Sequence, residues 1–433
     1  MRISISLSAA AVISVPIVVF GGYRIEQIAD ESLVNRDPTI SADGIVAWSS
    51  YGVTESGDSR SEIFVYVDGE RRSLTGGSMK PESANMHPQA SGGSLVWVGT
   101  FGTIAGDLTW VMKDPPRNPE EPEELDATYL ARCEPDGAGG SIGKQWFVGP
   151  GTNPAQGAVE TVVTNLSGPR RHPSGDAEIC LWQGGEIKRL TRDMRNDIGP
   201  SVWGNLVAWQ KARGWPFGWE IMLWDSGTRL QLTTNYYYDL TPRVQGRRVA
   251  WYGWDGHDYE IFLYDRDQDI TLQITSNDYD DVSPVVWGDM VAWEGYAGLD
   301  ADIYLWDGTE PRRLSKNPYE DSEPSLWNGL VAWQGFDGND FEIFLYRDGG
   351  VIQLTTNAYD DVSPKIRDGV TCWVGYYDNF DGEIFVWSQT NTLMLTDNDY
   401  DDRGVETAGG RLVWEARDGD RSLIMLAIPE NSP

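Results

Sequence analysis

Residues 277–314 read NDYDDVSPVVWGDMVAWEGYAGLDADIYLWDGTEPRRL, residues 317–354 read NPYEDSEPSLWNGLVAWQGFDGNDFEIFLYRDGGVIQL, and residues 357–395 read NAYDDVSPKIRDGVTCWVGYYDNFDGEIFVWSQTNTLML. The three stretches are copies of one unit. A Trp that ends an apolar triplet marks each copy, and equivalent residues recur at Trp48, Trp97, Trp209, Trp251, Trp293, Trp333, Trp373 and Trp414. From Trp209 onward the spacing is 40 to 42 residues. A fixed period of this length predicts a repeat fold whose units pack against their neighbours.

Each unit carries the signals of four short strands. In the regular copies a Pro opens the first run, and a two-residue turn of Gly, Asn or Asp type precedes the second run, which ends at the marker Trp. The third run, such as residues 261–264 (IFLY), is apolar on both faces, and a fourth run such as QLT follows a polar turn. A small sheet can bury both of its faces only between neighbouring sheets, which predicts a β-propeller.

The marker residues predict eight four-stranded antiparallel blades, with seven as the alternative. The last unit ends on its third run, residues 422–428, and residues 24–28 (RIEQI) supply a fourth strand. We therefore expect the N-terminal strand to pair with the C-terminal blade and close the ring, which would leave no open sheet edge.

The patterns Asn-x-Tyr-Asp-Asp-x-x-Pro and Asp-Gly-x-Asp-x-Glu-Ile-Phe-Leu-Tyr resemble the TolB-like (WD-repeat-like) β-propeller repeats of exported prokaryotic proteins. The resemblance covers about residues 25–428 and implies a single propeller outside the cytoplasm. TolB itself also has an α/β domain and a six-bladed propeller, neither of which this sequence shows. The resemblance therefore implies a fold and does not transfer an activity.

The composition narrows the function classes. The chain has 433 residues with 34 Lys and Arg against 66 Asp and Glu, a formal net charge of −32, and 20 Trp. So many apolar and aromatic residues exclude wholesale disorder. The acidity opposes binding to nucleic acids and to anionic lipid surfaces. Cations, cationic partners and neutral ligands remain as candidate ligands.

Two segments fall outside the repeat. Residues 1–22 carry Arg2 and then an uncharged apolar run, which is typical of a signal peptide, with an uncleaved N-terminal anchor as the alternative. Residues 23–433 form the propeller. Residues 114–176 are an insertion in the second blade, expected on the top face as a lid or docking arm, a disordered spacer or a degenerate blade. A disulfide between Cys133 and Cys180 is conceivable, and Cys372 fits a buried apolar position.

Acidic residues concentrate in loops that the propeller topology places on one face, called the top face. One set precedes each Pro or its equivalent by three residues: Asp197, Asp239, Asp281, Asp321, Asp361 and Asp402. A second set lies before the third strand: Asp255, Asp258, Glu260, Asp337, Asp340, Glu342, Asp378, Asp381 and Glu383. Ca²⁺ takes 6 to 8 oxygen ligands, so Ca²⁺ binding is one hypothesis, more for the second set than the first. The alternative is that each Asp caps its own turn.

One top-face loop departs from the acidic pattern. Residues 211–220 read KARGWPFGWE, which is basic and aromatic. Arg213, Trp215 and Trp219, together with Trp254 from the next unit, form the candidate ligand-binding site; blade-to-blade packing is the alternative interpretation. The remaining repeated Trp, which include Trp203, Trp287 and Trp327, are expected in the core.

A catalytic constellation is not evident. The histidines His87, His172 and His257 belong to different units, and no nucleophile elbow, HExxH motif, P-loop or dinucleotide fingerprint occurs. We predict an exported, monomeric, non-catalytic propeller that binds an envelope or extracellular protein, a glycan or a cation through its acidic top face, in the periplasm, at the cell surface or secreted. Ca²⁺ is the one expected cofactor. The alternatives are a polysaccharide lyase or hydrolase on the same face, with His257 as a weak catalytic candidate, and a purely structural cell-surface module.

Overall fold

The computed structural model describes residues 18–20, 22–29, 33–53, 59–76, 85–100, 132–135, 141–146, 158–159, 177–193, 195–213, 218–378, 381–388, 391–419 and 421–430. These residues form strands and turns and contain no helix, so the all-β prediction is confirmed. None of them forms a helix that is long and apolar enough to cross a membrane.

The strands repeat in groups of four. The first strands are β3 (Val34–Ile40), β7 (Asn85–Ser91), β14 (Asp197–Trp203), β18 (Asp239–Gln245), β22 (Asp281–Trp287), β26 (Asp321–Trp327), β30 (Asp361–Arg367) and β34 (Asp401–Ala408). The second strands are β4 (Val46–Val53), β8 (Ser94–Thr100), β15 (Leu206–Ala212), β19 (Arg248–Trp254), β23 (Met290–Gly295), β27 (Leu330–Phe336), β31 (Val370–Asp378) and β35 (Arg411–Asp418).

The third strands are β5 (Ser59–Val67), β12 (Ala177–Gln183), β16 (Trp219–Asp225), β20 (Tyr259–Asp265), β24 (Asp302–Trp306), β28 (Phe341–Arg347), β32 (Asp381–Ser388) and β36 (Arg421–Pro429). The fourth strands are β6 (Glu70–Ser73), β13 (Glu186–Arg189), β17 (Thr228–Gln231), β21 (Ile270–Gln273), β25 (Pro311–Arg313), β29 (Gly350–Gln353), β33 (Asn391–Met394) and β2 (Tyr23–Gln27). Consecutive strands of a group pair antiparallel, as the repeat predicts.

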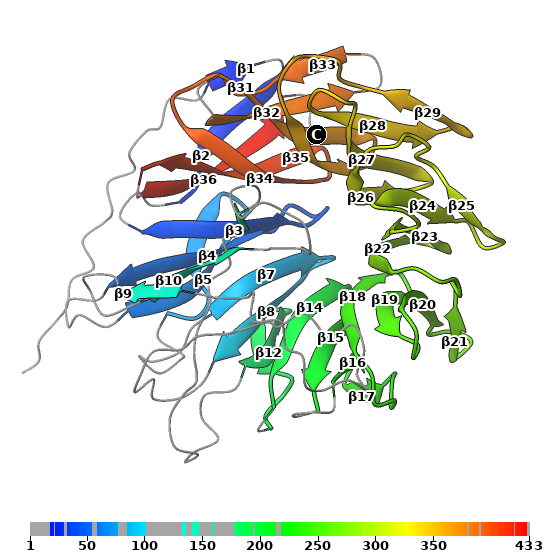
Figure 1. Cartoon of the computed structure of the whole chain (residues 1–433). Coiled ribbons are helices and arrows are strands. Elements are labelled where there is room, and N and C mark those ends of the chain that lie inside the picture. Colours follow the sequence, from blue (N-terminus) through cyan, green and yellow to red (C-terminus); the bar gives the residue numbers. More distant parts are fainter. Residues whose placement is uncertain are drawn as a thin grey trace, which may run out of the picture.

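The groups succeed one another around the molecule in chain order, as Figure 1 shows. The first strand of each group contacts the first strand of the next, and β34 also contacts β3. Strand β2 pairs antiparallel with β36, from Tyr23 opposite Pro429 to Gln27 opposite Met425. The expected pairing of the two ends of the chain is thus present. Eight blades in a continuous closed ring stay a prediction.

The turn between the first and second strands sets the register of each sheet. In the β22–β25 sheet, Trp287 pairs with Met290 across the two-residue turn Gly288-Asp289, and Gly288 has a φ of 58°. Asn328 in the next sheet has a φ of 48°. Gly and Asn tolerate this left-handed conformation, which two-residue hairpins require. The predicted turn positions are therefore confirmed in these sheets.

A bulge in the first strand links the sheet to the preceding one at Thr241, Glu323 and Ser363. Ser363, which precedes Pro364, has a φ of 53°, and the register of β30 shifts between Val362 and Lys365. The backbone N–H of Ser363 donates to Oε1 of Gln334 on β27 at 2.8 Å. The bulge therefore turns a backbone donor toward the preceding sheet, where a side chain satisfies it.

The core lies between successive sheets. All eight marker Trp side chains are almost fully buried. Trp293, for example, packs against Ile261 and Leu263 of the preceding sheet and stacks on Tyr304 of its own sheet at 5.7 Å between ring centroids. Burial of both faces of the third strand is thus satisfied by neighbouring sheets, as predicted.

Three Trp expected in the core are only half-buried. Trp203, Trp287 and Trp327 lie at the ends of first strands, and the ring of Trp287 contacts Trp203 at 5.8 Å and Trp327 at 5.9 Å between centroids. The guanidinium of Arg367 lies 5.2 Å from the Trp203 ring. First strands of several sheets converge here, so these aromatic rings meet each other. Each of the three rings also packs against a cluster of buried residues between two sheets, so the prediction that they belong to the core is confirmed in part.

The insertion leaves and re-enters one sheet at a single point. Thr100 at the end of β8 pairs with Ala177 at the start of β12, so residues 101–176 are an excursion between a second and a third strand. Within it, β9 (Arg132–Pro135), β10 (Ser141–Trp146) and β11 (Ala158–Val159) form a three-stranded sheet. At the N-terminus, β1 (Val18–Phe20) pairs with β2. Cys180 is a free, buried thiol, which contradicts the conceivable bond to Cys133, and Cys372 is buried as expected.

Candidate functional site

The candidate site is the loop face, which we define as the loops between second and third strands and the loops between successive sheets. Backbone contacts join the two kinds of loop. The N–H of Tyr259 donates to Oδ1 of Asp280 at 3.1 Å, and the N–H of Phe341 donates to Oδ1 of Asp360 at 3.0 Å. The two sets of acidic loops therefore lie on one face, as the topology predicts.

The Asp that precedes each Pro by three residues is a structural residue. In the β22–β25 sheet, Oδ1 of Asp281 accepts from Nε1 of Trp293 at 2.7 Å and Oδ2 accepts from Nδ2 of Asn277 at 2.6 Å. The same Asp–Trp bond recurs at Asp197, Asp239, Asp321, Asp361 and Asp402. A turn cap was the favoured interpretation of these residues, and the acceptor role is correct, but the main donors are the core Trp and the loop Asn.

Glycine makes this bond feasible. A Cβ at Gly335 would lie 2.3 Å from Oδ1 of Asp321, and one at Gly295 would lie 2.6 Å from Oδ1 of Asp281. The Trp-x-Gly sequence at the end of the second strand therefore leaves room for the carboxylate to reach the indole.

Burial disfavours the ionised form of these carboxyl groups. Desolvation raises the pKa of Asp281, Asp321 and Asp361 to about 6 and that of Asp197 and Asp402 to about 7. Hydrogen bonds from the Asn and Trp side chains oppose the shift and only partly offset it. These side chains are engaged within the fold, so the first acidic set does not favour cation binding.

A second buried acid lies near the start of the third strand in six sheets, and in three of them an arginine neutralises it. Arg189 pairs with Glu178 at 2.7 Å, Arg213 with Glu220 at 2.7 Å, and Arg313 with Asp302 at 2.6 Å. Arg189 and Arg313 occupy the same register, because they pair in the sheet with Cys180 and Tyr304, each two residues after the acid. In these two sheets the arginine lies on the fourth strand, whereas Arg213 directly follows the second strand β15.

Two sheets lack this arginine and carry a cluster of three carboxylates instead. The clusters are Asp255, Asp258 and Glu260, and Asp337, Asp340 and Glu342; within each, one ligand oxygen from every residue lies within 4.8 Å of the others. Glu260 and Glu342 are fully buried, and Asp258 and Asp340 are nearly so. The predicted metal ligands of these two loops are therefore brought together.

Several oxygens of these clusters lack hydrogen-bond partners among the described residues. They are Oδ1 of Asp258 and of Asp340, Oε2 of Glu260 and both carboxylate oxygens of Glu342. Desolvation, reinforced by the neighbouring acids, raises the pKa of Glu260 and of Glu342 to about 7, although the hydroxyls of Thr275 and Thr355 lie close enough to favour the ionised form. Buried polar oxygens are rarely left without a partner.

The third predicted loop, Asp378, Asp381 and Glu383, is incompletely described. The side chain of Asp378 lies outside the described residues. Oε1 of Glu383 accepts from the N–H of Asn398 at 2.9 Å, and desolvation raises its pKa. A cation at this loop stays a prediction.

The predicted aromatic site is partly assembled. Trp254 is 6% exposed and packs in one cluster with the half-buried Trp219, while Trp215 lies outside the described residues. Arg213 pairs with Glu220 and its guanidinium lies 5.1 Å from the Tyr236 ring. These contacts fit the blade-to-blade packing interpretation. Ligand binding by the four residues stays a prediction that the contacts do not favour.

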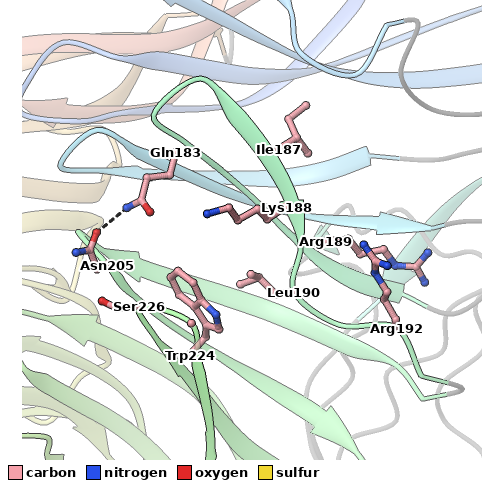
Figure 2. A pocket seen from close by; sticks show the side chains of 10 residues that line it. Gln183, Ile187, Lys188, Arg189, Leu190, Arg192, Asn205, Trp224 and Ser226 are labelled. Carbon is pink, nitrogen blue, oxygen red and sulfur yellow. Dashed lines mark hydrogen bonds between the residues drawn. The ribbon is translucent and has the colours of Figure 1, made fainter.

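His257 and a pocket on the flank of the propeller are further candidate sites. His257 is exposed, and its backbone N–H donates to Oδ1 of Asp255 at 2.9 Å. Figure 2 shows a pocket of about 570 Å³ between β13 and the next sheet, bridged by a 2.6 Å hydrogen bond from Gln183 to Asn205 and lined by Lys188, Arg189 and Arg192. None of the predicted site residues lines this pocket.

Exposed apolar side chains on the loop face were not predicted as site residues. Half of the exposed large hydrophobic side chains among the described residues lie there: Tyr236, Tyr296, Leu299, Tyr319 and Tyr400. Leu299 is fully exposed, and Tyr236 is 69% exposed. The Tyr of the Asn-x-Tyr pattern was visible in the sequence. Its exposure was not, because the pattern alone does not distinguish a packed loop from an open one.

No family model matches the chain, and no curated protein matches it. Solved structures do. The β-propeller domain of the Trilobed protease from Pyrococcus furiosus has 10% identity and a TM-score of 0.47, with 86% of this chain and 98% of that chain covered. A prolyl endopeptidase has 8% identity and a TM-score of 0.53, with 90% and 55% covered. TolB from Acinetobacter baumannii has 13% identity and a TM-score of 0.35, with 58% and 75% covered.

This chain spans less than two thirds of the length of several peptidase chains that it matches. At identities this low the likeness concerns the fold alone, and the activity printed for a peptidase is a property of that peptidase. The repeated four-stranded antiparallel sheets show a β-propeller fold. Membership of the TolB-like repeat family stays a prediction.

Proposed function

We propose that this chain is an exported, non-catalytic propeller that binds a protein partner on its loop face. The observation that supports it most is the coincidence of exposed Tyr and Leu side chains with exposed carboxylates on that face. Tyr is enriched at protein interfaces because it offers a large apolar ring and a polar tip. A partner that presents basic side chains around an apolar centre would match this surface.

The strongest local concentration lies over the β22–β25 and β26–β29 sheets. Tyr296 and Leu299 project from the loop after β23, and Tyr319 lies in the loop between β25 and β26. The ring of Tyr319 packs edge-on against Phe336 at 5.6 Å between centroids, which holds it in a fixed position. A rigid aromatic group costs less conformational entropy on binding than a mobile one.

Export rests on the N-terminal segment. Residues 3–20 carry no charge, and they precede β2 in the chain. We infer that this segment directs the chain across a membrane, as a cleaved signal or as an anchor. Fractionation of cells that express the full chain checks this inference, since recovery of the protein with cytoplasmic markers would contradict it.

The enzymatic alternative concerns the same face. A lyase or hydrolase would use a carboxylate or His257, which lies beside Asp255 on an exposed loop. Incubation with a panel of polysaccharides, with assays for reducing ends and unsaturated products, tests this alternative. Turnover by the wild type that is lost in His257→Ala would replace the binding proposal with an enzymatic one.

The binding proposal is tested with two matched triple variants. The loop-face variant carries Tyr296→Ser, Leu299→Ser and Tyr319→Ser, and the edge variant carries Ile270→Ser, Leu272→Ser and Val351→Ser on exposed fourth strands. A protein captured from envelope extract by the immobilised wild type is identified, purified and titrated against all three chains. We expect the loop-face variant to bind at least about tenfold more weakly, because interface aromatic residues carry much of the affinity. Equal loss in both variants, or unchanged affinity in the loop-face variant, would refute a partner site here.

A further inference from the structure

Six sheets bury a carboxylate near the start of the third strand. These residues are Glu178, Glu220, Glu260, Asp302, Glu342 and Glu383. A buried carboxylate is costly unless a positive charge or several donors neutralise it. Three sheets supply Arg189, Arg213 or Arg313 for this purpose.

The two remaining sheets with described clusters have lost the arginine. Gln353 pairs with Phe344 in the register that Arg313 occupies opposite Tyr304, and Gln273 does the same opposite Phe262. Among the described residues no ion pair reaches Glu342 or Glu260. A neutral amide therefore stands where Arg313 stands in the other sheet, although Glu260 and Glu342 are as deeply buried as the Arg-paired Glu178.

The loop before the third strand also differs between a sheet with the arginine and a sheet without it. The β26–β29 sheet has Asp337 at the first loop position, whereas the β22–β25 sheet has Ala297 there, next to the Arg-paired Asp302. Where the arginine is missing, one additional carboxylate is thus present, since Asp300 already matches Asp340. Without a bound cation, both differences would destabilise the buried acid. Glutamine in place of arginine removes a positive charge, and aspartate in place of alanine adds a negative charge.

We propose that Asp337, Asp340 and Glu342, and equally Asp255, Asp258 and Glu260, bind one hard divalent cation each, Ca²⁺ being the ion that fits best. Each cluster offers three carboxylates whose oxygens lie within 4.8 Å of one another. Five buried carboxylate oxygens of these two clusters have no hydrogen-bond partner among the described residues. Ca²⁺ accepts 6 to 8 oxygen ligands in a flexible arrangement, so waters and loop carbonyls complete the shell.

Hydrogen bonds within each loop hold its two aspartates in position. The N–H of Asp337 donates to the carbonyl oxygen of Asp340 at 3.1 Å, and the N–H of Asn339 donates to Oδ1 of Asp337 at 3.0 Å. The equivalent bonds recur from Asp255 to Asp258 at 3.1 Å and from His257 to Asp255 at 2.9 Å. Both loops therefore share the same hydrogen bonds, and each brings its two aspartates and its glutamate together. The inference does not depend on the partner proposed above.

The test counts bound ions on the full-length protein. Chain stripped with chelator is dialysed against Ca²⁺, with Mg²⁺ in a parallel arm, and the metal per chain is measured together with the melting temperature. We expect at least two Ca²⁺ per chain and a higher melting temperature with Ca²⁺. Less than one ion per chain at millimolar Ca²⁺ would overturn the proposal. Equal occupancy by Mg²⁺ would overturn the choice of Ca²⁺ as the ion.

Three variants exchange the residues at which the β22–β25 and β26–β29 sheets differ. Gln353→Arg places a guanidinium opposite Phe344, and Asp337→Ala copies Ala297; each is expected to remove one ion per chain or to weaken that site at least about tenfold. The melting temperature of metal-free Gln353→Arg should not fall, which separates neutralisation from misfolding. The double variant Ala297→Asp and Arg313→Gln should gain one ion. Asp348→Asn, on an exposed turn, is the control; a stoichiometry that none of the site variants changes would refute the sites.

Discussion

The β22–β25 and β26–β29 sheets are consecutive copies of one design that differ in how a buried acid is neutralised. Both hold an Asp–Trp bond of 2.7 Å between the first and second strands, Asp281 to Trp293 and Asp321 to Trp333. In the first sheet Arg313 lies 2.6 Å from Asp302, whereas Glu342 of the second sheet has no such partner among the described residues. The repeated scaffold is therefore constant, and function is to be sought where the copies diverge.

The largest expected effect concerns what the two sheets share. Trp293→Ala and Trp333→Ala each remove an indole that is almost fully buried between sheets. We expect each to lower the free energy of unfolding by about 3 to 5 kcal/mol through loss of packing and the cavity that remains. Urea unfolding followed by fluorescence measures both. A cost under about 1 kcal/mol for either variant, or a large difference between them, would contradict equivalent cores.

A smaller effect is expected at the position where the sheets differ. Arg313→Gln leaves Asp302, whose side chain is 4% exposed, with Ser315 as its remaining side-chain partner. We expect a loss of about 1 to 2 kcal/mol, the lower part of the usual range for an unsatisfied buried carboxylate, because Arg313 is 39% exposed and water screens the pair.

The neighbouring residue provides the matched control for that experiment. Arg312 pairs with Asp307 on the exposed surface of the same strand and turn. Arg312→Gln should leave the midpoint of urea unfolding unchanged. If both arginine variants had the same effect, the ion pair at Asp302 would be no more important than a surface pair, and the proposed equivalence of arginine and metal would lose its basis.

The period of the repeat was sufficient to predict the strands, the turns and the buried marker Trp. It predicted Gly288-Asp289 as a hairpin turn and Trp293 as core, because each depends on local pattern and on burial between like neighbours. It also placed Asp337, Asp340 and Glu342 in one candidate cluster, which the structure brings together.

Other features depended on contacts that sequence spacing does not reveal. Arg313 lies eleven residues after Asp302, and its role becomes visible only when Tyr304 is known to pair with Arg313. Likewise Trp203 and Trp287 meet although an intervening first strand separates them in the chain. Long-range register and the convergence of inner strands decide these contacts, and both are properties of the assembled fold.

The smallest expected effect concerns the Asp–Trp bond that both sheets share and how its contribution to stability depends on pH. Desolvation raises the pKa of Asp321 from 3.8 to about 6, so between about pH 4 and 6 the folded chain holds a proton that the unfolded chain has released. Stability contributed by this group is therefore fully present below about pH 4 and is lost as the pH rises through 6.

Asp321→Asn stays neutral throughout and keeps an acceptor for Trp333. We expect the stability of wild type relative to this variant to fall by on the order of 1 kcal/mol between pH 4 and 7. Urea midpoints measured across that range check the sign: a parallel pH dependence in both proteins would mean that Asp321 is already ionised in the fold, and that the Asp–Trp bond is charge-assisted at all these pH values.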